Sequence, residues 1–175
     1  MQSRTNERRC DQPMTDGLLL LQLLVLLGIA NGAPVLLRKL FKNWLAAPLD
    51  GGVKFFDGPF FGPSKTIRGV VASIVLTSFS AAMLGWDWSL GAWLAVLSML
   101  GDLGTSFVKR RMGLEAHAQA FALDQIPEAL LPLVVLRNSL GLNWFDVVFV
   151  VLAFMLLSLL LSRALYKFGI REQPF

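Results

Sequence analysis

An acid, a hydroxyl and a basic cluster share one short stretch of this 175-residue chain, between Gly101 and Arg111. If the stretch is helical, one face carries polar side chains at positions i, i+4, i+7 and i+8. These side chains are Asp102, Ser106, Lys109 and Arg110. A carboxylate is a ligand for a hard cation such as Mg²⁺, and lysine and arginine bind phosphate oxygens. The spacing therefore points to chemistry on a phosphate-bearing molecule.

A second acid, Asp124, lies in the sequence Leu123-Asp124-Gln125, inside another apolar segment. A charged side chain at the centre of a bilayer costs about 2.5–3.5 kcal/mol on insertion scales. The cost of burying two such acids is offset if they share a cation or belong to a network of ion pairs. Mg²⁺ commonly takes one or two carboxylates together with substrate phosphates. Asp102 and Asp124 are therefore candidate Mg²⁺ ligands, and a structural ion pair with a nearby lysine or arginine is the alternative for Asp102.

A third set of candidates lies in the sequence Gly62-Pro63-Ser64-Lys65-Thr66-Ile67-Arg68-Gly69, which leads into an apolar segment. We predict Ser64 as the N-cap of a helix, with Lys65 and Arg68 on one face one turn apart. Two cations and two hydroxyls at a helix N-terminus suit an anion such as phosphate. The alternative is an anchor whose basic side chains extend to lipid headgroups.

Two other polar residues are weaker candidates. Asn31, in the first apolar segment, is expected to make an interhelical hydrogen bond rather than bind a ligand. Glu128 follows Asp124 by four residues, but Pro127 lies between them and interrupts regular helical spacing. We therefore expect Glu128 to have a structural or peripheral role.

These candidates must be positioned by apolar segments, because 55% of the residues are hydrophobic and only 16% are charged. A soluble domain has about 25% charged residues. Five segments approach the ~20 residues that a spanning helix needs. They are residues 17–37, 69–85, 90–108, 121–136 and 144–165. The sequence predicts an all-α, polytopic membrane bundle of five transmembrane helices over residues 17–175, preceded by a polar extension over residues 1–16.

The orientation of the bundle follows from its basic residues. Most of the 16 lysines and arginines lie in residues 38–68, 109–111 and 163–171, which share one side of a five-span protein. The positive-inside rule places that side, the C-terminus and the candidate site in the cytoplasm, and the N-terminus outside. Residues 38–68, rich in proline and glycine, are predicted to form one long loop. Because the basic residues lie mainly in the connections between apolar segments, the net charge of +4 does not indicate nucleic-acid binding.

Taken in order, the motifs resemble those of the CDP-archaeol synthase family, which belongs with the phosphatidate cytidylyltransferases. The matching motifs are Gly62 to Gly69, Gly101-Asp102-x-x-x-Ser106-x-x-Lys109-Arg110 and Leu123-Asp124-Gln125. The resemblance implies that CTP and a membrane lipid phosphate, of archaeol or phosphatidate type, give a CDP-lipid and pyrophosphate. This would be a step of phospholipid biosynthesis in the bilayer.

The resemblance also implies roles for individual residues. Mg²⁺ would be held by Asp102 and Asp124. The catalytic groups would be Asp102, Lys109 and Asp124, and the substrate-binding groups Lys65, Thr66, Arg68, Ser106 and Arg110. The cytidylyltransferase signature usually carries a second acid three residues after the first, where this chain has Pro127.

Two other functions are alternatives to this one. A CDP-alcohol phosphotransferase requires Asp-Gly followed by Ala-Arg, whereas Asp57-Gly58 is followed here by Pro59-Phe60. A small membrane transporter or scaffold would use Asp102, Asp124 and Arg110 as an ion-pair network. The sequence is compatible with a homo-oligomer, and it does not distinguish an isoprenoid ether chain from a diacyl chain.

Overall fold

The computed structural model describes residues 16–41, 47–49, 51, 54–55, 58–59, 65–111 and 121–167, with side chains except at 54–55, 58–59, 110, 121–124 and 162–167. These residues form five helices and two short strands. The helices are α1 (Gly17–Phe41), α2 (Ile67–Met83), α3 (Trp88–Arg111), α4 (Phe121–Val135) and α5 (Trp144–Lys167). The strands β1 (Lys54–Phe55) and β2 (Gly58–Pro59) pair antiparallel. Each predicted apolar segment contains one helix, so the all-α prediction is confirmed.

Within the described residues, three helices are long and apolar enough to cross a membrane, over Gly17–Phe41, Trp88–Lys109 and Trp144–Leu161. The other two are shorter, with 17 residues in α2 and 15 in α4. At 1.5 Å per residue these two reach about 25 and 22 Å, less than the ~30 Å hydrocarbon core. The prediction of five complete spans therefore stays a prediction.

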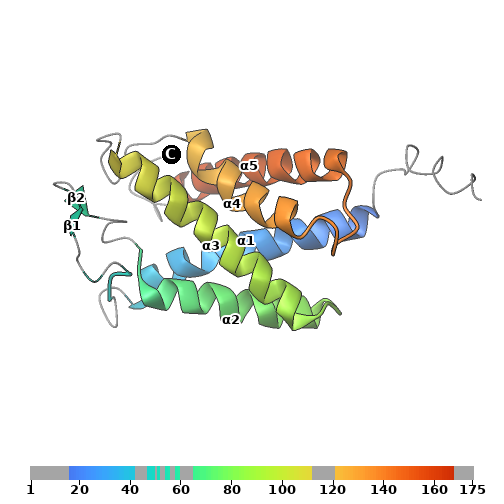
Figure 1. The fold of residues 1–175 in the computed structure, drawn as a ribbon, viewed down its shortest axis with the longest axis horizontal. Coiled ribbons are helices and arrows are strands. Elements are labelled where there is room, and N and C mark those ends of the chain that lie inside the picture. Colours follow the sequence, from blue (N-terminus) through green and yellow to red (C-terminus); the bar gives the residue numbers. More distant parts are fainter. Residues whose placement is uncertain are drawn as a thin grey trace, which may run out of the picture.

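Helix α3 crosses the middle of the bundle and has α2 on one side and α4 on the other (Figure 1). Helix α1 packs against α2, α3 and α5, and α4 packs against α5. The largest fully buried apolar side chains come from α1, α3, α4 and α5 and include Leu23, Leu26, Leu27, Leu94, Leu133, Val147 and Val150. Outward faces of the same helices remain apolar, for example at Leu156 and Leu160 of α5. This distribution suits a bundle surrounded by lipid.

Two glycines allow neighbouring helices to approach closely. A Cβ atom at Gly91 would lie 2.6 Å from Cβ of Ala81, where α3 meets α2. A Cβ atom at Gly101 would lie 2.4 Å from the carbonyl oxygen of Pro127, where α3 meets α4. Helices in lipid associate through such small-residue contacts because there is no hydrophobic force between them. The two contacts fix α3 against both of its neighbours.

The predicted loop over residues 38–68 is shorter than expected, because α1 continues to Phe41 and α2 begins at Ile67. Arg38 and Lys39 lie in the last turn of α1, where cations interact favourably with the helix dipole. The first apolar segment, predicted over about residues 17–37, is therefore extended by one helical turn.

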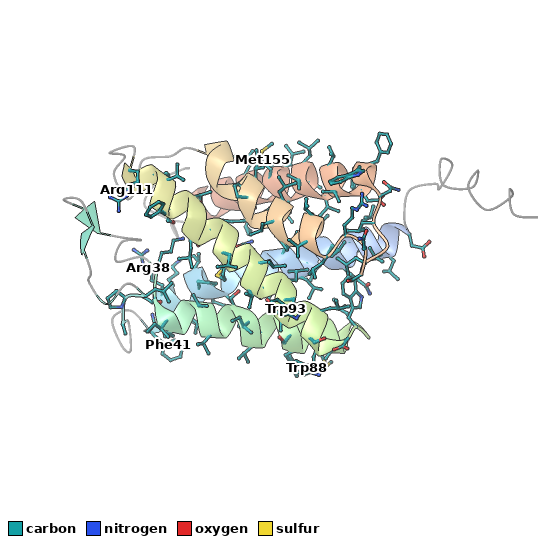
Figure 2. The ribbon with its side chains drawn as sticks, viewed as in Figure 1. Arg38, Phe41, Trp88, Trp93, Arg111 and Met155 are labelled. Atoms are coloured by element: carbon teal, nitrogen blue, oxygen red, sulfur yellow. The ribbon has the colours of Figure 1, made fainter. Side chains whose placement is uncertain are left out.

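The two ends of the bundle differ in chemistry. We call one the basic end, where α1 and α3 finish and α2 and α4 begin; its described basic side chains are Arg38, Lys39, Lys65, Arg68, Lys109 and Arg111. We call the other the tryptophan end; its tryptophans are Trp86, Trp88 and Trp144. Figure 2 shows Arg38 and Arg111 at one end and Trp88 at the other. The candidate residues lie at the basic end.

Candidate functional site

The entry into α2 positions the first group of candidates. Thr66 is the N-cap of the helix, and its hydroxyl accepts a hydrogen bond from the backbone N–H of Gly69 at 3.2 Å. The prediction of Ser64 as the cap is therefore wrong, and Ser64 itself lies outside the described residues. Lys65 precedes the helix, so it does not share a helical face with Arg68 as predicted. Arg68 lies in the first turn of α2 and is half-buried.

Backbone hydrogen bonds hold Lys65 and Thr66 in an extended conformation. The N–H of Leu49 donates to the carbonyl of Lys65 at 2.8 Å, and the N–H of Ile67 donates to the carbonyl of Ala47 at 3.1 Å. Pro48 and Thr66 form an antiparallel β-bridge between these two bonds. This pairing keeps the chain extended through Thr66, which explains why the helix begins later than the sequence indicated.

The side chain of Lys65 contacts the candidate metal ligand. Its Nζ atom forms an ion pair and hydrogen bond with Oδ2 of Asp102 on α3. The two side chains are 21% and 19% exposed, so both are largely withdrawn from solvent. The ion pair considered as an alternative for Asp102 is therefore present. It also places a phosphate-binding cation beside a carboxylate that can bind metal.

The other candidates on α3 follow Asp102 toward the basic end. Ser106 and Lys109 are half-buried on the last turns of the helix. Arg110 belongs to α3, but its side chain is outside the described part. The guanidinium of Arg111 lies 4.9 Å from the ring centroid of Phe107, a cation–π contact. Helix α3 thus carries an acid deeper in the bundle and cations nearer its end.

The start of α4 lies next to Asp102 because Gly101 contacts the backbone of Pro127 and Glu128. Asp124 precedes Pro127 by three residues, so its backbone position is on the same face of α4. The side chain of Asp124 lies outside the described part. Glu128 is half-buried at this crossing, and its structural or peripheral role stays a prediction. The structure therefore brings together the two helices that carry the predicted acids.

The sequence interpretation missed two features of this crossing. One is the contact between Gly101 and Pro127, for which the signal was a glycine directly before an acid in an apolar helix. The other is Gln125, whose buried Oε1 has no hydrogen-bond partner within the described residues. Its signal was its place beside Asp124 in the motif. Both features mark the crossing of α3 and α4 as more crowded and more polar than the motif alone indicated.

The residues suit a metal ion bound mainly through a phosphate ligand. Within the described ranges, no three His, Cys, Asp or Glu residues cluster as an all-protein metal cage would require. Mg²⁺ usually binds through one or two carboxylates and completes its octahedron with water and substrate phosphates. Asp102, with Asp124 on the adjoining helix, fits that smaller requirement.

The electrostatics of the basic end suit a polyanion. Helices α2 and α4 both begin there, and helix N-termini carry partial positive charge. Full positive charges are added by Lys65 beside Asp102, by Arg68 in the first turn of α2 and by Lys109 near the end of α3. Asp102 lies about 21 Å along α3 from Trp88, given 1.5 Å per residue. The acid is therefore deeper in the bundle than the terminal cations of α3.

Comparisons with known proteins point to one and the same family. A family model described as CarS-like, CDP-archaeol synthase, matches residues 78–175. A CDP-archaeol synthase of Sulfolobus acidocaldarius is 31% identical over 154 residues, which cover 84% of this chain and 91% of the relative. One of Hyperthermus butylicus is 39% identical over 104 residues, which cover 55% of this chain and 59% of the relative.

A solved structure also matches. It is described as an intramembrane enzyme for archaeal membrane lipid biosynthesis, and it superposes with a TM-score of 0.65 and 31% identity over 81% of this chain and 91% of that one. The match extends over most of the bundle and agrees with an integral membrane protein. On the strength of the Sulfolobus relative, the family model and this structure, the chain belongs to the CDP-archaeol synthase family.

Proposed function

We propose that this chain transfers the cytidylyl group of CTP to an archaeol-type lipid phosphate at the basic end of the bundle. Family membership makes it a membrane-embedded, CTP-dependent cytidylyltransferase that forms a CDP-lipid. The curated relatives are named CDP-archaeol synthases, which supports an isoprenoid ether phosphate as the acceptor. The non-enzymatic transporter or scaffold is not favoured, because the relatives are enzymes.

The observation that carries the location of the site is the contact between Lys65 and Asp102. In the reaction, an oxygen of the lipid phosphate attacks the α-phosphorus of CTP. The bond from that phosphorus to the bridging oxygen of the β-phosphate breaks, and pyrophosphate leaves. Phosphoryl-type transfer depends mainly on positioning and on neutralising charge. The cations of the basic end, with Asp102, would supply both the positioning and the neutralisation of charge.

We assign the catalytic roles to Asp102, Lys109 and Asp124, and the substrate-binding roles to Lys65, Thr66, Arg68, Ser106 and Arg110. The cations at the entry of α2 would bind the triphosphate, where backbone N–H groups of the helix also point. Lys109, one helical turn nearer the end of α3 than Ser106, would neutralise the reacting phosphates. This division follows from their places on two different helices.

Asp102 and Asp124 would hold Mg²⁺. There the ion would supply positive charge that offsets the charge developing on the leaving group. Lys65 would remain close enough to Asp102 to orient its carboxylate and to contact a phosphate. The protein's own contribution is thus to fix one carboxylate and several cations around the triphosphate.

The site would face the cytoplasm, with the C-terminus inside and the N-terminus outside, because basic residues favour that side. Helices α2 and α3 are joined by a short turn at the tryptophan end, so the longer α3 continues beyond the start of α2. The difference between 24 and 17 residues corresponds to about 10 Å. Lys65 and Thr66 would therefore lie at the level of lipid headgroups or slightly below it, where CTP can meet a lipid phosphate.

The test is a reaction in vesicles with α-labelled CTP, Mg²⁺ and a panel of lipid phosphates. We expect labelled CDP-lipid together with an equal amount of unlabelled pyrophosphate. The isoprenoid ether phosphate should be the better acceptor. If only diacyl phosphatidate gave labelled product, the proposed identity of the lipid acceptor would be wrong. No labelled lipid from any acceptor would contradict the proposed function.

A further inference from the structure

Polar side chains from three helices meet at one level of the apolar core, below the pair formed by Lys65 and Asp102. Asn31 comes from α1, Ser73 from α2 and Ser98 from α3. Ser73 and Ser98 are fully buried. None of the three belongs to the proposed site, so their hydrogen bonds need another explanation.

Asn31 connects α1 to α3. Its Nδ2 donates to the carbonyl of Leu27, one turn earlier in the same helix, at 3.1 Å. Its Oδ1 accepts from the hydroxyl of Ser98 at 3.2 Å. The carboxamide is thus oriented by its own helix and presents its oxygen to α3.

The same turn of α1 also holds α2. The hydroxyl of Ser73 donates to the carbonyl of Ala30 at 2.7 Å. One turn away, a Cβ atom at Gly69 would lie 3.1 Å from Cβ of Pro34, so α1 and α2 are also in close contact there. Residues 30 and 31 therefore bind both α2, which follows Lys65, and α3, which carries Asp102.

The position of Ser98 on α3 explains how its hydrogen bond to Asn31 affects Asp102. The two residues are four apart on α3, so they lie on the same face one turn from each other. A bond that holds Ser98 against α1 also fixes which way Asp102 faces. Helix packing in lipid lacks a hydrophobic driving force, so van der Waals packing and interhelical hydrogen bonds such as this one hold the helices together.

We propose that Asn31 is a positioning residue: its hydrogen bond to Ser98 sets the rotation of α3 that directs Asp102 toward Lys65 and the metal–nucleotide ligand. The inference rests on the proposed function and deepens it. Asp102 has a short side chain and cannot compensate for a rotated helix, whereas the long side chain of Lys65 can follow it. A misplacement of about 1 Å can lower a rate about 100-fold.

The experiment measures Mn²⁺ binding by electron paramagnetic resonance, with full-length protein and CTP but no lipid acceptor, so that no turnover occurs. We expect Asn31→Leu and Ser98→Ala each to weaken Mn²⁺ binding about tenfold, the lower end of the effect of residues that orient metal ligands. The double variant should bind no more weakly than either single variant, because both remove the same bond.

The matched control is Thr77→Val. Thr77 is fully buried on α2, one turn beyond Ser73, and its hydroxyl has no hydrogen-bond partner within the described part of the chain. This variant removes a buried hydroxyl from the same region and should bind Mn²⁺ as the wild type does. Equal weakening in Thr77→Val would overturn the inference.

Unchanged Mn²⁺ affinity in Ser98→Ala, or losses that add in the double variant, would also overturn it. Ser98→Ala removes one oxygen and keeps the packing, so it provides the test even if Asn31→Leu does not fold. Failure of the wild type to bind Mn²⁺ with CTP would instead contradict the proposed function. The two failures are therefore distinguishable.

Discussion

The charged groups at the tryptophan end are satisfied by residues that are close in the sequence. The carboxylate of Asp87 accepts a hydrogen bond from the backbone N–H of Ser89 at 2.8 Å. Asn143 and Asp146 cap the start of α5 reciprocally, each side chain accepting from the other's backbone N–H at 3.0 Å. These contacts stabilise turns and helix starts.

The basic end uses its charges differently. Lys65 and Asp102 are 37 residues apart; Lys65 lies in the extended segment before α2, and Asp102 lies on α3. Their contact depends on the extended segment before α2, which is held by backbone hydrogen bonds. One end of the bundle thus uses charge to build local structure, and the other uses it to bring distant groups together, which is what a site for a polyanion requires.

The largest expected effect compares the same substitution at both ends. Asp102→Asn should lower turnover at least about 100-fold, because it removes the charge of a proposed metal ligand. Asp146→Asn should change turnover less than about twofold, since the amide oxygen can still cap α5. CDP-lipid formation measures both, and size-exclusion chromatography checks that the variants are folded. Equal losses at both ends would remove the distinction between them.

A second prediction separates the structural from the functional role of the ion pair. Lys65→Met should raise the KM for CTP about tenfold, since it removes one charge-assisted phosphate contact. It should also lower the free energy of unfolding by about 1–2 kcal/mol, less than the loss of a fully buried partner would.

The double variant Lys65→Met with Asp102→Asn gives the decisive comparison. It should recover part of the free energy of unfolding that Lys65→Met loses, because no buried carboxylate is left unpaired. Its activity should stay low. Thermal unfolding and steady-state kinetics measure the two quantities separately. Recovery of activity together with stability would show that the pair is structural only.

A smaller effect is expected at the helix crossing beside Asp102. Gly101→Ala should lower the free energy of unfolding by about 1–3 kcal/mol and reduce activity, because the new Cβ meets the backbone of Pro127. Gly104→Ala is the control on the same helix, since nothing lies within 4 Å of a Cβ there. Thermal unfolding of both variants measures the difference. Equal destabilisation would show that the substitution weakens α3 itself rather than its contact with α4.

The smallest effect belongs to the tryptophan end. Hydrogen bonds from the backbone and then the side chain of Ser89 lower the pKa of Asp87 below its usual value. Because the folded pKa is the lower one, the stabilisation is complete above the unfolded pKa and is lost as the pH falls through the folded pKa. Asp87→Ala should therefore lower the Tm slightly at pH 7, and this difference should close in strong acid. Turnover at neutral pH should be unchanged.

Much of the fold was predictable from the sequence because apolar periodicity is a local property. Each of the five apolar segments corresponds to a helix, and the basic residues that finish α1 and α3 lie at the same end of the bundle, as the order of the segments indicated. Asn31 makes the interhelical hydrogen bond that was expected of it. The side chains of Asp124 and Arg110 lie outside the described part, so their assigned roles stay predictions.

The sequence by itself determined the membrane character, the helices and the kinds of chemical group available, because hydropathy and residue type depend only on short windows. The tertiary structure decided that Thr66 rather than Ser64 caps α2, that Lys65 is the partner of Asp102, and that Gly101 meets Pro127. Each of these depends on how two distant segments cross and rotate against each other. Local residue preferences do not specify a crossing, because serine and threonine are both good caps and every nearby cation is an equivalent partner for an acid until the helices pack.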